Sequence, residues 1–239
     1  RHTPAHAPNP AWPQPGEERA RMHFDSAHHA TLAEGLVFFG STVDNQVYAL
    51  DADSGEIHWR FYTGGPVRFA PTYDKGNLFF GSDDGFVYCV EAQTGDELWR
   101  YQAGPTTERI LGNGRMISVW PIRTSILVDQ DQVMFGAGVF PHESIYIGAL
   151  HAQDGSEIWV NSSTGEKTFE LNYGGISPQS YLIASDTTLY VPSGRAMPAA
   201  FDRKDGKFLF YLSPGGKVGG TWALLDQGEL IAGVERQSL

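Results

Sequence analysis

Short runs rich in apolar residues, with a period-two pattern, recur through most of residues 33–239. In one run, Val47 and Ala49 fall on one face of the expected strand, and Tyr48 and Leu50 fall on the other. Both faces are therefore apolar, which is typical of a strand covered by neighbouring sheets. Because helical periodicity is nearly absent, the pattern predicts an all-β chain.

One hairpin pattern recurs four times along the chain. It is written ALDADSGEIHW in residues 49–59, CVEAQTGDELW in 89–99, ALHAQDGSEIW in 149–159 and AFDRKDGKFLF in 200–210. A glycine ends the polar turn of each copy, where a short hairpin with a bulge requires positive φ. These glycines are Gly55, Gly95, Gly155 and Gly206. We interpret the four segments as hairpin turns and not as phosphate-binding loops.

An aromatic residue closes each copy of the hairpin. These residues are Trp59, Trp99, Trp159 and Phe210. We interpret them as wedges between adjacent sheets, because a large ring buries much apolar area at a fixed place. Trp59 and Trp99 are 40 residues apart, which is the length of a four-stranded propeller blade, and the later intervals carry insertions. The sequence therefore predicts a β-propeller of four-stranded antiparallel blades.

The blades occupy residues 33–239 in this prediction. Residues 1–32 are rich in proline and are predicted to form an irregular lead-in. A fifth apolar run, at residues 230–235, has no hairpin after it, so we expect the blades to be incomplete at the C-terminus. Most of the inserted chain lies between the outer strand of one blade and the inner strand of the next, where binding surfaces are commonly found.

Composition narrows the classes of partner. The chain carries 28 acidic and 17 basic residues and a formal net charge of -11, which disfavours nucleic acid because phosphate binding needs clustered Lys and Arg. No run of about 18 apolar residues is present, so no membrane span is predicted. The single cysteine, Cys89, can form no internal disulfide, and its alternating surroundings predict a buried thiol.

No local motif indicates covalent catalysis or a metal centre. His28 and His29 would point to opposite sides of a strand, so they do not readily share one metal ion. The segment SDDG, residues 82–85, resembles a fragment of a calcium loop, but we interpret it as a β-turn between two strands. We therefore expect no catalytic residue and no metal site in this chain.

The pattern Ala-x-Asp-x-x-Thr/Ser-Gly-x-x-x-Trp, best seen in residues 49–59, resembles the tryptophan-docking repeat of the pyrroloquinoline-quinone-like (PQQ-like) β-propellers. The resemblance covers most of residues 33–239, and GGPVRFAP, GSDDGFVYC and GNGRMISVWPIRT are similar to planctomycete-type PQQ-repeat proteins. This family includes quinoprotein alcohol dehydrogenases and a lipoprotein of the outer-membrane assembly machinery that has no cofactor. Its propellers close with about seven or eight blades, so the resemblance implies that the roughly five blades here form a partial ring.

The resemblance implies a non-catalytic scaffold for protein or ligand binding, as a module of a larger exported protein in the periplasm or another extracytoplasmic compartment. A protein or peptide partner is expected, and further blades or domains of the same polypeptide, or another copy, would complete the ring. A propeller with no small-molecule ligand is a further option.

The alternative is a PQQ-dependent oxidoreductase module. Resemblance to that branch would imply an adjacent Cys-Cys pair that stacks on the quinone, and a calcium or lanthanide ion held by carboxylates and amides. The Cys-Cys pair is absent from the sequence. No cofactor is therefore expected, with PQQ and calcium as the alternative, because blades outside this chain could hold those ligands.

Three polar residues occupy equivalent places in successive blades. Each of them lies 13 residues before the residue that ends the second strand of its blade: Arg68 before Gly81, Arg123 before Gly136 and Gln179 before Pro192. This spacing places all three where the innermost strand begins, beside the central channel. The insertion ahead of Arg123 brings Arg115 and Trp120 within reach. Because guanidinium groups suit planar oxyanions, the five residues are predicted to bind an anionic peptide or a planar carboxylated ligand.

A structural role for the same arginines stays open at this point. Each could pair with a local carboxylate, such as Asp74 or Asp129, or with a carbonyl at a strand end, because buried arginines are commonly paired. The two interpretations differ in what the guanidinium groups contact.

Overall fold

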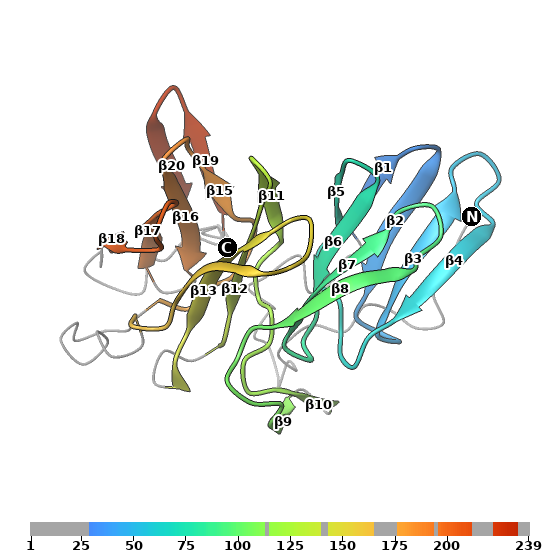
Figure 1. Cartoon of the computed structure of the whole chain (residues 1–239), viewed down its shortest axis with the longest axis horizontal. Helices are drawn as coiled ribbons and strands as arrows, with labels where there is room; N and C mark the ends of the chain where they lie inside the picture. Colours follow the sequence, from blue (N-terminus) through green and yellow to red (C-terminus); the bar gives the residue numbers. More distant parts are fainter. Residues whose placement is uncertain are drawn as a thin grey trace, which may run out of the picture. The chain divides into compact units, whose positions relative to one another are not determined.

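The computed structural model describes residues 29–112, 115–139, 143–164, 176–193, 196–211 and 222–233. Within these ranges every regular element is a β-strand (Figure 1). No helix among the described residues is long and apolar enough to cross a membrane. The chain divides into two compact units, residues 1–122 and 123–239. The prediction of an all-β chain is confirmed.

The first unit contains two four-stranded antiparallel sheets and a hairpin. The strands of the first sheet are β1 (Ala30–Ala33), β2 (Leu36–Ser41), β3 (Gln46–Asp51) and β4 (Ile57–Tyr62). Those of the second sheet are β5 (Thr72–Asp74), β6 (Asn77–Gly81), β7 (Phe86–Glu91) and β8 (Glu97–Gln102). The hairpin is formed by β9 (Arg109–Gly112) and β10 (Arg115–Ser118).

The second unit repeats this organisation. Its two four-stranded sheets contain β11 (Leu127–Asp129), β12 (Gln132–Ala137), β13 (Tyr146–His151) and β14 (Glu157–Asn161), and then β15 (Ile183–Ala184), β16 (Thr188–Ser193), β17 (Ala196–Asp202) and β18 (Phe208–Phe210). A two-stranded sheet follows, made of β19 (Trp222–Asp226) and β20 (Glu229–Gly233). In all four larger sheets the spatial order of the strands is their order in the chain, which is the meander of a propeller blade.

The first sheet begins earlier than the sequence predicts. β1 pairs with β2 from Ala30↔Phe39 to Ala33↔Leu36, so residues 30–32 belong to the sheet and not to the predicted lead-in. The four residues of β1 are too few for a clear alternation, and pairing with β2 is what makes them a strand. Residues 1–28 of the lead-in lie outside the described residues.

The hairpin glycines have the backbone geometry that their turns require. The φ values of Gly55, Gly95, Gly155 and Gly206 are 74°, 76°, 70° and 70°. The ladder shifts register just before each turn, between Ala49 and Leu50 in the first copy, and at equivalent places in the other three. Each copy therefore forms a bulged hairpin, as the turn chemistry predicts.

In each unit, the tryptophan that closes the first four-stranded sheet lies between that sheet and the second one. The Nε1 of Trp59 donates a hydrogen bond to the carbonyl of Ala92 at 2.9 Å, and a Cβ added to Gly95 would stand 2.7 Å from the indole. Trp159 makes the same contacts with the carbonyl of Arg203, at 2.8 Å, and with Gly206. The glycine of one hairpin thus leaves the space that the preceding indole fills.

The other two closing aromatics differ from each other. Trp99 is buried and lies 5.9 Å from Phe79 between ring centroids. Phe210 is 40% exposed, so the wedge interpretation does not describe its surroundings. Cys89 is fully buried as predicted, and this burial raises the pKa of its thiol to about 12.

Candidate functional site

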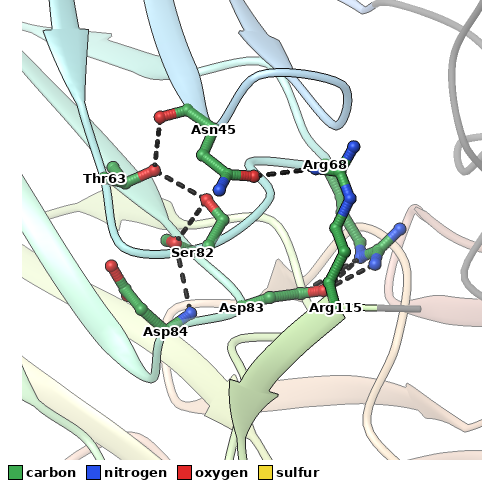
Figure 2. Close-up of polar contacts among 8 residues, drawn as sticks. Asn45, Thr63, Arg68, Ser82, Asp83, Asp84 and Arg115 are labelled. Atoms are coloured by element: carbon green, nitrogen blue, oxygen red, sulfur yellow. Dashed lines mark hydrogen bonds and ion pairs between the residues drawn. The ribbon is translucent and has the colours of Figure 1, made fainter. Parts of the chain in front are cut away.

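Polar side chains gather at one end of the two sheets of the first unit. Because the strands are antiparallel, the β2–β3 turn, the β6–β7 turn and the connection 63–71 all lie at this end, and the glycine hairpins lie at the other. Figure 2 shows the residues that meet there. They are Asn45, Thr63, Arg68, Ser82, Asp83, Asp84 and Arg115.

The centre of this cluster is a buried ion pair between Arg68 and Asp83. The Nε of Arg68 donates to both carboxylate oxygens of Asp83, at 3.0 and 2.9 Å, and its Nη2 donates to Oδ2 at 2.5 Å. Both side chains are almost completely shielded from solvent. Arg68 therefore pairs with a local carboxylate, which is the structural role that the sequence left open. The carboxylate comes from the β6–β7 turn and not from Asp74.

Asp84, the next residue of the turn, is also satisfied by the protein. Its Oδ2 accepts hydrogen bonds from the backbone N–H of Gly64 at 2.7 Å and from the hydroxyl of Tyr88 at 2.8 Å. Its Oδ1 accepts from the N–H of Phe86 at 3.1 Å. Burial, and then the charge of Asp84, raise the pKa of the Tyr88 hydroxyl above its usual range, so this phenol stays a donor. The carboxylate therefore fixes the turn to the connection between the sheets.

The SDDG segment is the β6–β7 turn, as interpreted from the sequence. The N–H of Gly85 donates to the carbonyl of Ser82 at 3.1 Å, and Gly85 has a φ of 90°. The Ser82 hydroxyl donates to the carbonyl of Gly65 at 3.0 Å. Among the described residues, no group of three or more His, Cys, Asp or Glu side chains is placed to hold a metal ion.

Arg115 reaches the neighbouring β2–β3 turn from β10. Its Nη1 donates to Oδ1 of Asn45 at 2.9 Å, and its Nη2 donates to the carbonyl of Val43 at 2.6 Å. Asn45 has a φ of 58°, and its carbonyl accepts the N–H of Thr63 at 2.9 Å. The arginine therefore ties the β9–β10 hairpin to the end of the first sheet.

The remaining predicted ligand residues have different surroundings. Trp120 is buried in the first unit, with its indole against Gly104, where an added Cβ would stand 2.5 Å away. Arg123 and Gln179 lie in the second unit, and their N–H groups donate to the carbonyls of Gly136 and Pro192, each at 3.1 Å. These two residues are thus equivalent in backbone position. That they converge with Arg68 on one funnel stays a prediction.

The backbone that leads into Arg68 and Arg123 is positioned in the same way in two repeats. Arg68 and Arg123 each follow an apolar residue that is seated on a glycine at the end of a second strand. An added Cβ on Gly40 would stand 2.4 Å from Val67, and one on Gly81 would stand 2.2 Å from Ile122. The close approach needs glycine, and it fixes the chain direction at the residue that follows.

Sequence reasoning missed the role of the aspartates and of Arg109. An Asp lies four residues before a strand Tyr in two repeats, as Asp44 before Tyr48 and Asp84 before Tyr88, and both pairs are hydrogen-bonded. This in-register spacing was the available signal. Arg109 carries no repeat signal, yet its guanidinium lies over Gly64 and donates to the Gly64 carbonyl at 3.2 Å.

Antiparallel four-stranded sheets in meander order, packed through a tryptophan and a glycine hairpin, define blades of a β-propeller with PQQ-like repeats. The profile of a family described as outer membrane protein assembly factor BamB matches residues 9–172, and the chain belongs to this family. No curated protein sequence shows a significant match.

Solved structures share the fold at low sequence identity. The quinohemoprotein alcohol dehydrogenase ADHIIG of Pseudomonas putida HK5 is 17% identical with a TM-score of 0.62, over 85% of this chain and 37% of that one. The quinohemoprotein alcohol dehydrogenase of Comamonas testosteroni is 17% identical with a TM-score of 0.63, over 85% and 38%. BamB of Moraxella catarrhalis is 19% identical with a TM-score of 0.52, over 77% and 48%. The chain thus spans less than half the length of each of these proteins.

Proposed function

We propose that this chain supplies blades of a PQQ-like β-propeller that acts as a non-catalytic scaffold for a protein or peptide partner. The observation that carries the proposal is the internal pairing of the polar cluster in the first unit. Asp83 is bound by Arg68, and both oxygens of Asp84 accept hydrogen bonds from the protein itself. Carboxylates engaged in this way stabilise the fold and have little capacity left for a ligand.

A quinone with calcium is the alternative, and the two aspartates of the polar cluster do not favour it. Calcium takes about six to eight oxygen ligands, several of them from free carboxylates. In the polar cluster of the first unit, both carboxylate oxygens of Asp83 and both of Asp84 already accept hydrogen bonds from the protein. The sequence also has one cysteine and therefore no adjacent Cys-Cys pair.

The two-stranded sheet of the second unit supports a larger assembly. Leu224 and Ile231 are paired across β19 and β20 and are exposed. The equivalent pair, Leu127 and Met134 on β11 and β12, packs into the core shared with the next sheet. We propose that the exposed face receives a further blade, from the same polypeptide or from another copy. An extracytoplasmic location is proposed on the family's description as an outer membrane assembly factor.

Calcium and PQQ titrations test the proposed function. We expect calcium at about 10 mM, which fills even weak extracellular sites, to leave the thermal midpoint unchanged. We also expect no reduction of an artificial dye after addition of PQQ and calcium to the purified chain. Dye reduction that disappears when calcium is chelated would overturn the scaffold proposal in favour of the oxidoreductase module.

A further inference from the structure

We infer that the first sheet carries a socket for an indole, and that its occupant is Trp12 of this chain's own lead-in. The socket consists of the carbonyl of Ala52, which accepts the indole N–H, and the hairpin turn that ends at Gly55. Trp12 itself lies outside the described residues. The inference goes beyond the proposed scaffold function, because it makes this face of the scaffold a site for the chain itself and not for a partner.

The backbone of the socket is the one that holds Trp59 on the second sheet. Ala52 and Ala92 each follow a third strand and donate the N–H to a glycine carbonyl at 2.9 Å. Gly55 and Gly95 each donate the N–H to the carbonyl of the last residue of that strand, at 2.9 and 2.8 Å, and have φ values of 74° and 76°. The first sheet therefore presents the same acceptor and the same glycine turn as the second.

The apolar face beside the socket also repeats between the two sheets. On the second sheet, Phe80 and Tyr88 are paired across the strands and stacked at 5.4 Å between ring centroids, within the core that contains Trp59. On the first sheet, Phe39 and Tyr48 are paired in the same way and stacked at 5.0 Å. The first sheet is thus suited to pack an indole on this face, as the second sheet does.

The surroundings of the acceptor differ between the sheets. Ala92 and Arg203, whose carbonyls accept an indole N–H, are buried, whereas Ala52 is exposed. No described residue donates a hydrogen bond to the carbonyl of Ala52. This carbonyl is therefore accessible to an indole N–H, and a ring seated there would cover Ala52 as Trp59 covers Ala92.

The sequence selects Trp12 as the occupant. Trp12 precedes Gly55 by 43 residues, and the two described indole–glycine contacts bridge intervals of 36 and 47 residues. No other tryptophan precedes Gly55 in the sequence, and the family profile already matches from residue 9. Pro10, Pro13 and Pro15 flank Trp12 and favour an extended chain, which lowers the conformational entropy lost on docking.

Fluorine NMR of the full chain labelled with 5-fluorotryptophan tests this inference. The signal of Trp12 is identified as the one lost in Trp12→Phe. A soluble gadolinium chelate broadens the signals of exposed rings, and the chain supplies two references, Trp222 at 46% exposed and Trp59 at 9%. We expect the Trp12 signal to resist broadening as that of Trp59 does. Broadening equal to that of Trp222 would overturn the inference.

Glycine substitutions locate the indole. We expect Gly55→Ala to shift the signal of Trp12, as Gly95→Ala shifts that of Trp59. Gly35→Ala is the matched control, because its φ is 76° and no atom lies within 4 Å of the added Cβ. A protected Trp12 signal that moves no more in Gly55→Ala than in the control would place the indole elsewhere and refute the socket. Circular dichroism verifies that each variant is folded, and the broadening measurement on the unsubstituted chain needs no variant beyond the one that assigns the signal.

Light scattering separates an occupant from a second copy. We expect the scattering mass to be unchanged by Trp12→Ala, because the contact lies within one chain. A dimer that dissociates in Trp12→Ala would assign the socket to the lead-in of another copy and overturn the inference. Failure of the socket inference leaves the scaffold proposal standing, whereas calcium-dependent dye reduction overturns the scaffold proposal whatever the fluorine signals show.

Discussion

Gly95→Ala tests the contact that joins the first two sheets. Gly95 has a φ of 76°, and a Cβ at this position would stand 2.7 Å from the Trp59 indole. The substitution therefore combines a backbone cost with a steric cost. Gly35→Ala is the matched control, because Gly35 has the same φ of 76° and no atom within 4 Å of the added Cβ.

The magnitudes follow from separating these two costs. A left-handed conformation costs an alanine about 1 to 2 kcal/mol, and the lower entropy of the unfolded chain offsets about 0.4 to 1 kcal/mol of this. Gly35→Ala is therefore expected to cost about 1 kcal/mol. Overpacking adds about 1 to 3 kcal/mol at Gly95, where the indole is confined between sheets. Gly95→Ala should thus be more destabilising than its control by that amount.

Urea denaturation followed by circular dichroism measures the difference. A double-mutant cycle with Trp59→Leu makes the measurement specific, because removal of the indole plane should bring the cost of Gly95→Ala down to that of Gly35→Ala. Equal costs for the two glycine substitutions in the wild-type background would refute the idea that the glycine leaves space for the indole. A change in the denaturant slope would mean that the substitution alters the compactness of the native or the unfolded state, or that unfolding is no longer two-state.

Three further predictions test the polar contacts. Arg68→Met should cost about 3 to 5 kcal/mol in urea denaturation, because it leaves the Asp83 carboxylate buried and unpaired, and Arg68→Met with Asp83→Leu should recover most of it. Burial and the bond to an aspartate raise the pKa of Tyr48 from 10.0 to about 12, so its contribution to stability is complete below pH 10 and is lost as pH rises toward 12. Tyr48→Phe should flatten this part of the pH profile, and an unchanged profile would contradict the assignment. Arg203→Ala should cost about 1 to 3 kcal/mol while Trp159 fluorescence stays that of a buried indole, because the indole bonds to the backbone of residue 203.

The blade architecture could be predicted from the sequence because its signals are local. The turn of each hairpin is specified by a glycine with positive φ, and the fixed interval to the closing aromatic sets the length of the outer strand. Gly55 and Trp59 carry both signals within five residues. The start of β1 at Ala30 could not be seen, because a four-residue strand has too few positions to show alternation.

The partners of the polar side chains could not be predicted in the same way. Arg68 pairs with Asp83, which lies 15 residues away on the far side of β5 and β6, and the nearer Asp74 offered an equally plausible carboxylate. Which aspartate is chosen depends on the turn geometry of Ser82–Gly85, where Asp84 is held by the backbone of Gly64. The hydrogen-bonding of one aspartate thus directs the other toward the arginine.

The fourth repeat shows which parts of the pattern the fold needs. The residue whose carbonyl accepts the indole is Ala92 in the second copy and Arg203 in the fourth. The carbonyl of Arg203 nevertheless accepts the Trp159 indole at 2.8 Å, because a backbone acceptor does not depend on the side chain. The arginine side chain is buried and donates to Asp129 at 2.7 Å and to the carbonyl of Ser185 at 2.8 Å. The glycine gap and the backbone acceptor are therefore the features that the repeat must keep, and the side chain between them is free to form new contacts.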